Sequence, residues 1–390
     1  MQRSRRLLHL FHPILEAWHL SGRTTRRRAY RPYVASIISR GTSMESGELL
    51  EARQTLYRLL AHLYLHPPEL STLATLQTIP GLGDAAPETI DGLEQLQVEY
   101  EYIFGRNAYP YESLYVDHDL MLNTAAANRF AQLCQDCGFA EESPVGAPDH
   151  LGRQLGLMAY LLAIEISALR EQNPALLTWA RAHQHRCLSD HLAHWAPVFL
   201  GVVERVANHP LYRTVAQVTL ELILNDLERS ASLPLWIPLD ERRVAPDPTP
   251  SPVQDEDAGA LSAHTGDDSA RDLNQIVRSL IIPNIAGMFI SRYDISMLGR
   301  RLRIKAPIRE RKQMMRDLFD VAARFDLVPT LLDHLDELFA TEFWRLAVLT
   351  ERYPAWTAHA RHWLFRLEQS REMVRDLRAQ YLTYQMQESQ

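Results

Sequence analysis

The sequence predicts an all-α protein, and three observations support this fold class. From Met44 onward, apolar residues recur at spacings of three and four, which places them on one face of an α-helix. Alternating apolar and polar runs, which are typical of half-buried strands, are scarce. Helix-ending residues such as Pro67 and Pro68 follow the apolar stripes. We therefore expect a helical bundle, followed by a linker and a second small helical unit.

Four apolar stripes are expected to form the main helices of the bundle. Their residues should face the core, because one stripe of an amphipathic helix is buried. Asp149 directly precedes the second stripe and is predicted to be its N-cap. The stripes are Leu49, Leu56, Leu59, Leu60 and Leu63; Leu151, Leu155, Met158, Leu162, Ile166 and Leu169; Leu188, Leu192, Trp195 and Phe199; and Leu211, Val215, Val218 and Leu222.

The composition changes after Leu239 and predicts a boundary. Residues 240–272 are rich in proline, acidic residues, glycine and serine, which indicates a solvated linker. Beyond it helical spacing resumes, without an internal repeat. The predicted units are a basic extension (1–43), a helical bundle (44–239), the linker (240–272) and a C-terminal helical unit (273–390). The C-terminal stripes are Ile295, Leu298 and Leu302; Leu331, Leu335 and Leu338; and Trp356, Ala360, Trp363 and Leu367.

The charge of the chain is unevenly distributed. Residues 1–43 contain nine arginines against the single acid Glu16, whereas the whole chain has a formal charge of −7. The body from Met44 onward is therefore acidic, which disfavours nucleic acid as its partner. Arg5 and Arg6 stand in an order similar to an export signal, but His9 and later polar residues interrupt the apolar stretch that a signal needs. We expect a disordered basic tail, or a start codon assigned upstream of a true start at Met44.

The composition predicts a cytoplasmic protein. No apolar run approaches the roughly 18 residues that a membrane helix needs. Cysteine occurs three times, at Cys134, Cys137 and Cys187, and an odd, low count argues for a reducing compartment.

A segment rich in aromatic and acidic residues, 99–115, differs from the stripes around it. Aromatic walls can bind an apolar peptide, and a nearby carboxylate can pair with an arginine. The alternative is that the aromatics pack beneath a long loop. The segment contains Glu99, Tyr100, Glu101, Tyr102, Ile103, Phe104 and Gly105, then Pro110, Tyr111, Glu112, Ser113, Leu114 and Tyr115.

This segment, with Val98 before it, resembles the first motif of the TorD/DmsD/NarJ family of molybdoenzyme chaperones. Two further segments resemble the second and third motifs, and three ordered motifs are more specific than one. The resemblance runs from about Met44 to Leu235. The second motif contains Pro148, Asp149, His150, Leu151, Gly152, Leu155 and Met158, and the third contains His191, Leu192, Trp195, Pro197, Phe199, Leu211, Tyr212, Arg213 and Ala216.

The resemblance implies an all-α chaperone, not an enzyme and without a cofactor. It would bind the twin-arginine leader of an apo-molybdoenzyme and hold it from export until the cofactor is inserted. Gln154 stands where the family usually has glutamate, so we do not expect it to anchor an arginine. Asp117 and Asp119 are further candidates to face the leader's arginines. The implied leader-binding residues are Tyr100, Phe104, Tyr111, Glu112, Ser113, Tyr115, Asp149, His150 and Leu151.

Two alternatives use histidine and cysteine. His183, Cys187, His191 and His194 would share one face of a continuous helix, which is typical of metal ligands. They would span roughly 16 Å, too far for one ion to bind all four. The C-x-x-C of Cys134 and Cys137 precedes Gly138 and lacks the preceding strand of a redox motif, so we predict the last turn of a helix with Gly138 as its C-cap.

The C-terminal unit offers the last alternative, a nucleic-acid-binding adaptor. Ser291 to Lys305 resembles a capped short helix with a basic end, and Arg309, Arg311 and Lys312 extend the basic region. Such residues usually form a solvated face, and docking of the client enzyme is the other interpretation. No phosphate-binding glycine motif occurs. A homo-oligomer stays open, since helices can be exchanged through a long linker.

Overall fold

A computed structural model describes residues 47–232, apart from positions 80, 88, 119 and 141–145, and residues 273–388, apart from 306 and 307. The predicted basic extension, the predicted linker at 240–272 and Asp119 lie outside the described residues. The boundary between the two units therefore stays a prediction.

Helices form the whole regular structure of the described residues, so the predicted all-α class is confirmed. The bridge between Tyr111 and His150 is isolated, and no strand occurs in the ranges given above. The helices of the first region are α4 (Gly47–Leu65), α5 (Leu70–Gln77), η1 (Gly83–Ala85), α6 (Ile90–Tyr102), η2 (Ile103–Asn107), α7 (Ser113–Val116), α8 (Ala125–Cys137), α9 (Leu151–Arg170), α10 (Pro174–Cys187), η3 (Leu188–Leu192), α11 (Ala193–Val206) and α12 (Pro210–Ser232).

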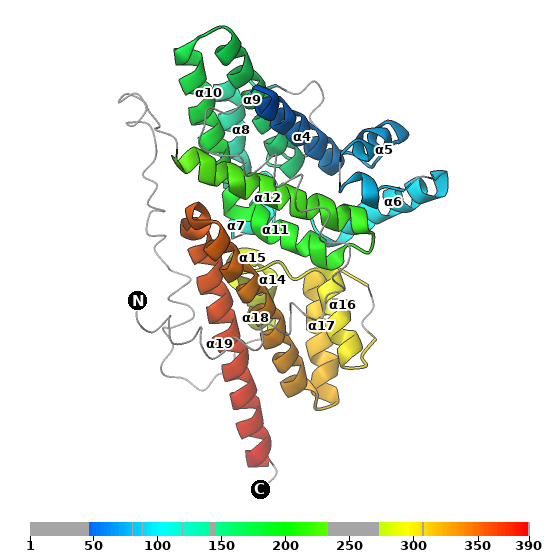
Figure 1. The fold of residues 1–390 in the computed structure, drawn as a ribbon. Coiled ribbons are helices and arrows are strands. Elements are labelled where there is room, and N and C mark those ends of the chain that lie inside the picture. Colours follow the sequence, from blue (N-terminus) through cyan, green and yellow to red (C-terminus); the bar gives the residue numbers. More distant parts are fainter. Residues whose placement is uncertain are drawn as a thin grey trace.

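The C-terminal region is also helical, and it packs against the first. In Figure 1 its helices lie beside α11 and α12, and the long α18 and α19 run next to each other. One hydrophobic cluster contains Trp195 of α11 together with Phe289 and Trp356 of the C-terminal region. The helices are α14 (Leu273–Ile281), α15 (Pro283–Ala286), α16 (Arg292–Arg301), α17 (Arg311–Arg324), α18 (Val328–Arg352), η5 (Pro354–Trp356) and α19 (Thr357–Glu388).

Two predicted helix ends are confirmed. Gly138 is the C-cap of α8, with a φ of 65° that an L side chain adopts only with strain. Ser291 and Asp294 form a capping box at the start of α16, in which each side chain accepts a hydrogen bond from the other residue's backbone N–H. Both ends are set by residues within four positions of each other, so a local pattern could reveal them.

The predicted N-cap of α9 is wrong by one residue. His150, not Asp149, is the N-cap, and its Nδ1 accepts a hydrogen bond from the backbone N–H of Gly152 at 3.0 Å. Asp149 does accept a backbone hydrogen bond, but from Ser113 at the start of α7, at 2.6 Å. The carboxylate therefore stabilises a different helix, 36 residues earlier.

The third predicted stripe begins in a π-helical turn. Residues 188–192 form η3, and the α-helical part α11 starts only at Ala193. Pro197 lies inside α11 and has no N–H, so it cannot donate to the carbonyl of Ala193. That carbonyl instead accepts from the indole of Trp356, at 2.9 Å. Helix α11 is thus completed by the C-terminal region.

No helix among the described residues is long and apolar enough to cross a membrane.

Candidate functional site

The first two motifs meet through their backbones. The N–H of Glu112 donates to the carbonyl of Asp149 at 3.2 Å, and the N–H of Leu151 donates to that of Pro110 at 2.8 Å. The ring of Tyr111 lies edge-on to the ring of His150, with centroids 5.0 Å apart. The turn before α7 and the start of α9 are therefore held as one unit, although they are distant in sequence.

A buried polar network joins all three motifs at Glu112. Its carboxylate, 1% exposed, lies 3.0 Å from Nδ1 of His191 and 2.5 Å from the side-chain nitrogen of Gln154. The carboxylate can only accept, so this geometry puts a hydrogen on Nδ1 of His191. The side-chain oxygen of Gln154 accepts from the indole of Trp195 at 3.0 Å. Gln154 thus bridges Glu112 and Trp195.

The side chain at position 154 satisfies the hydrogen-bonding groups of both its neighbours in this network. A glutamine offers a donor to the Glu112 carboxylate and an acceptor to the Trp195 indole at the same time. Gln154 itself is fully buried. The departure from the family pattern therefore has a structural role, which sequence reasoning missed.

His150 is held in its neutral form. Burial, and then the positive charge of Arg153, lower the pKa of His150 to about 3. Its Nδ1 acts as the acceptor that caps α9, a role that a protonated ring could not fill. Burial, and then the Asp149 carboxylate, raise the pKa of Tyr111.

The aromatic residues of the first motif pack in the core. The ring of Phe104 contacts those of Tyr100 at 5.0 Å and Tyr212 at 5.9 Å between centroids. Tyr115 packs on Trp195 and on Phe289, at 5.3 and 5.2 Å. The sequence left two interpretations open, a peptide-binding wall and packing of the aromatics in the interior. In this conformation the aromatics pack in the interior.

Eight of the nine predicted leader-binding residues are buried in this conformation, and Tyr111 is half-buried. The structure therefore brings the nine residues together, but mostly beneath the surface. Asp117, the other candidate acid, accepts a hydrogen bond from the N–H of Ala126 at 3.1 Å, so it holds the start of α8.

The predicted metal face does not follow one helical register. The π-turn η3 interrupts the α-helix between Cys187 and His194, so the four residues are not on one continuous α-helix. His183 Nδ1 lies 2.9 Å from the carbonyl of Trp179, and His191 contacts Glu112. Within the described ranges, no three histidine, cysteine or acidic side chains are grouped to hold a metal.

The C-x-x-C pair lies where it was predicted, in the last turn of α8. Cys137 is a free thiol. Burial raises the pKa of Cys137 to about 11, which is opposite to the shift of a reactive thiolate.

The basic region of the C-terminal unit is smaller than predicted, because Arg311 is buried. Its guanidinium lies 3.8 Å from the centre of the Phe289 ring and donates to the carbonyl of Ile290 at 2.9 Å. Burial lowers the pKa of Arg311 to about 10. Arg303, Lys305, Arg309 and Lys312 are exposed.

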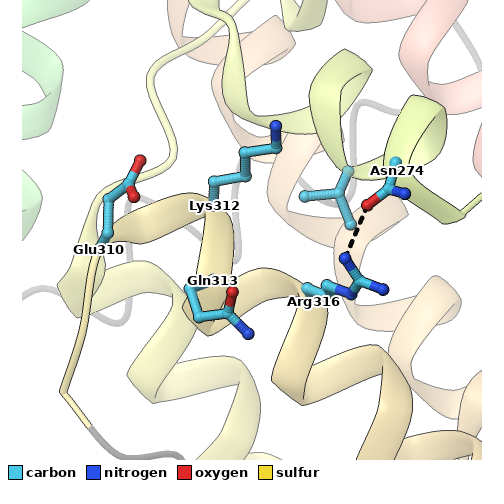
Figure 2. A pocket seen from close by; sticks show the side chains of 6 residues that line it. Asn274, Glu310, Lys312, Gln313 and Arg316 are labelled. Carbon is cyan, nitrogen blue, oxygen red and sulfur yellow. Dashed lines mark hydrogen bonds between the residues drawn. The ribbon is translucent and has the colours of Figure 1, made fainter.

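A hollow of about 210 Å³ lies between the starts of α14 and α17 (Figure 2). Arg316 donates across it to the side chain of Asn274, at 2.9 Å. Val277, Glu310, Lys312 and Gln313 complete its lining. It is smaller than the roughly 300 Å³ of ordinary small-molecule sites and distant in sequence from all three motifs.

The fold and the buried network define an all-helical protein whose three motifs share one polar core. Residues 71–201 match the family described as nitrate reductase delta subunit. Over 121 residues the chain is 33% identical to proteins named chaperone protein TorD from Vibrio cholerae serotype O1, strains O395 and M66-2. That alignment covers 31% of this chain and 53% of each relative, so the chain spans about half the length of the curated relatives it matches.

Residues 71–201 are therefore the part of the chain that is similar to the nitrate reductase delta subunit family, and the chain is also similar to TorD chaperones. The matched range is shorter than the predicted extent of 44–235, but it includes all nine predicted leader-binding residues. These relatives are named chaperones, and that the chain is not an enzyme stays a prediction.

Proposed function

We propose that the chain is a cytoplasmic chaperone that binds the twin-arginine leader of an apo-molybdoenzyme and assists cofactor insertion, assembly and export proofreading. The observation that carries this proposal is the convergence of the three motifs on Glu112, inside the range that matches the nitrate reductase delta subunit family.

The chemistry of the motifs supports a peptide that combines arginines with an apolar stretch. Glu112 and Asp149 are carboxylates, and a guanidinium pairs with a carboxylate through two parallel hydrogen bonds. The walls around them are aromatic and aliphatic, as an apolar peptide segment requires. The leader would contact Tyr111 first, since this residue is the half-buried one.

The proposed mechanism is a binding equilibrium without covalent chemistry. The chaperone would hold the leader while the client folds around its cofactor, and release would follow when the folded client competes for the leader. Binding must be strong enough to delay export and weak enough to reverse, which corresponds to a Kd of order 1 μM, or about −8 kcal/mol.

Calorimetric titration with a synthetic twin-arginine leader tests the proposal. We expect saturable binding of the native leader and weaker binding of a copy in which lysines replace both arginines, because lysine cannot form the two-pronged pair. Absence of saturable binding of the native leader would overturn the proposal.

A charge-neutral variant locates the contact. Glu112→Gln should reduce the preference for arginine over lysine, whereas Glu101→Gln, at an exposed acid of the same motif, should leave it unchanged. Thermal unfolding of both variants shows whether the fold is retained. Equal arginine preference in the wild type and Glu112→Gln would place the contact elsewhere.

A further inference from the structure

A short part of the C-terminal region, residues 283–294, lies against the first motif, and we call it the cover segment. Three hydrogen bonds join it to the motif and to Val116, which directly follows the motif. The side-chain nitrogen of Asn284 donates to the carbonyl of Val116 at 2.8 Å. The N–H of Tyr293 donates to the side chain of Asn107 at 2.9 Å, and Arg292 donates to the carbonyl of Arg106 at 3.0 Å.

The centre of the cover segment seals the aromatic side of the motif. Phe289, fully buried, stacks on Tyr115 with an interplanar angle of 26°. Tyr115 is one of the nine predicted leader-binding residues and is itself fully buried. While Phe289 holds this position, no peptide side chain can reach the Tyr115 ring from that side.

Arg311, which follows the cover segment in the chain, brings positive charge close to the motif. Arg311 lies on the Phe289 ring and acts on Tyr115, whose pKa is raised by burial first and lowered in part by Arg311 and Arg205. Within the described ranges Arg311 has no carboxylate at salt-bridge distance. Glu310 attracts Arg311, but from beyond salt-bridge distance. The buried guanidinium therefore disfavours a second cation beside it, such as an arginine of the leader.

The first and second motifs retain unused hydrogen-bonding capacity beneath the surface. Ser113 Oγ, Tyr115 OH and Asp149 Oδ1 are buried and have no hydrogen-bond partner among the described residues. Each is free to pair with a ligand, and a buried polar atom gains most from a new partner. Covered aromatics and unused polar atoms thus occur together where the first and second motifs meet.

We propose that residues 283–294 are a built-in cover, which closes the leader-binding motif in the free chaperone and opens locally before the leader binds. This inference rests on the proposed function and adds a regulatory step to it. The measured association constant then equals the association constant of the open state multiplied by the fraction of molecules that are open.

Weakening the cover should therefore strengthen leader binding. Asn284→Ala combined with Arg292→Ala removes two of the three hydrogen bonds. It also removes the contact of Asn284 with His362 and that of Arg292 with the carbonyl of Arg309, both inside the C-terminal region. We expect the double variant to bind the leader on the order of tenfold more tightly than the wild type, since each lost bond shifts the opening equilibrium a few-fold.

A matched control removes equivalent groups inside the C-terminal region. Gln313→Ala with Arg301→Ala deletes an amide that donates to Asp317 and a guanidinium that donates to Glu337, neither of which touches the motif. The control should bind the leader as the wild type does. If leader binding is present but both double variants match the wild type, the cover is overturned. If no variant and no wild type binds the leader, the proposed function fails, and the cover with it.

Hydrogen exchange provides a readout that does not depend on affinity. The N–H of Tyr293, bonded to Asn107, should exchange faster when the leader is added to the wild type. Unchanged or slower exchange at saturating leader would overturn local opening. Should the Asn284 variant fail to unfold cooperatively, Arg292→Ala alone replaces it, because this guanidinium is partly exposed and its loss leaves the core intact.

Discussion

The indole nitrogen of Trp356 donates to the backbone carbonyl of Ala193 across 2.9 Å, and this bond replaces one that the helix cannot make. Four residues after Ala193 stands Pro197, which has no N–H. Two further carbonyls of α11 also accept hydrogen bonds from the C-terminal region. Trp363 donates to the carbonyl of His194, at 2.7 Å, and Arg345 donates to that of Pro197, at 2.8 Å. The C-terminal region thus completes the helix that carries the third motif.

Trp356→Phe should destabilise the protein by about 1–3 kcal/mol, because it leaves the Ala193 carbonyl buried without a donor and replaces the buried indole with a smaller aromatic ring. The loss should be smaller in a Pro197→Ala background, where residue 197 regains an N–H that can reach the Ala193 carbonyl. Urea unfolding of the four proteins of this cycle measures the coupling. Trp344→Phe, at a residue 40% exposed, is the control and should change stability by less than about 0.5 kcal/mol. Strict additivity of the two substitutions would contradict the role given to Pro197.

The sequence predicted those parts of the fold that depend on neighbouring residues. Apolar spacing located the main helices, and local chemistry located the ends at Gly138 and Ser291. The N-cap of α9 was misplaced by one residue because Asp149 and His150 both have acceptors suited to a cap. Both are buried, but the Asp149 carboxylate accepts from the backbone N–H of Ser113, on another helix.

The candidate site could be predicted only as a set of residues. Its central contact joins Glu112 and His191, 79 positions apart, and no local pattern connects them. Phe289 lies outside the recognised motifs, so its position on Tyr115 had no sequence signal. The buried state of the motif could not be foreseen either, because aromatic spacing is the same for a core and for a groove.

Gln154→Glu should destabilise the free chaperone by about 2–4 kcal/mol at pH 7. It places a second carboxyl group beside the Glu112 carboxylate and removes the donor between them. A buried acid next to a carboxylate has a raised pKa, so the destabilisation is largest at neutral pH and should shrink as the pH falls toward 5. Urea unfolding at both pH values measures the change.

An exposed pair of the same chemistry is the control for this substitution. The side chain of Gln132 donates to Asp136 at 2.9 Å on the surface of α8. Gln132→Glu should cost less than about 0.5 kcal/mol, because water screens the two charges. Equal effects at positions 154 and 132 would show that the Glu112 network is not isolated from solvent.

The neutral state of His150 should make the protein sensitive to acid. Its pKa is about 3 when folded, against the ordinary 6.5, so between these values the unfolded chain binds a proton that the folded chain does not. The contribution of neutral His150 to the free energy of unfolding is therefore fully present above pH 6.5. It falls as the pH is lowered, by up to about 1.4 kcal/mol per pH unit. His150→Asn keeps an acceptor for the N–H of Gly152 and does not titrate. From pH 7.5 to 5.0 the variant should lose about 2 kcal/mol less than the wild type in urea unfolding.

The control for this comparison is His118→Asn, at an exposed histidine that is not among the groups that shift the pKa of His150. It should lose stability with pH as the wild type does. If His150→Asn retains the full acid sensitivity of the wild type, His150 is not the group that links folding to pH in this range.

Arg205 should contribute far more to stability than an exposed arginine with similar contacts. Its guanidinium lies 3.0 Å from Glu342 and 3.4 Å from Asp294, whose side chains are 3% and 5% exposed. Burial alone would lower the pKa of Arg205, but these two carboxylates outweigh it and the pKa is raised. Arg205→Leu leaves both carboxylates short of a counter-charge and should cost about 3–5 kcal/mol, with little dependence on salt. Arg301→Leu breaks an equally close contact with Glu337, but both side chains are more than half exposed, so it should cost less than about 1 kcal/mol. Comparable losses in urea unfolding for the two variants would mean that α11 and the C-terminal region are not joined through Arg205.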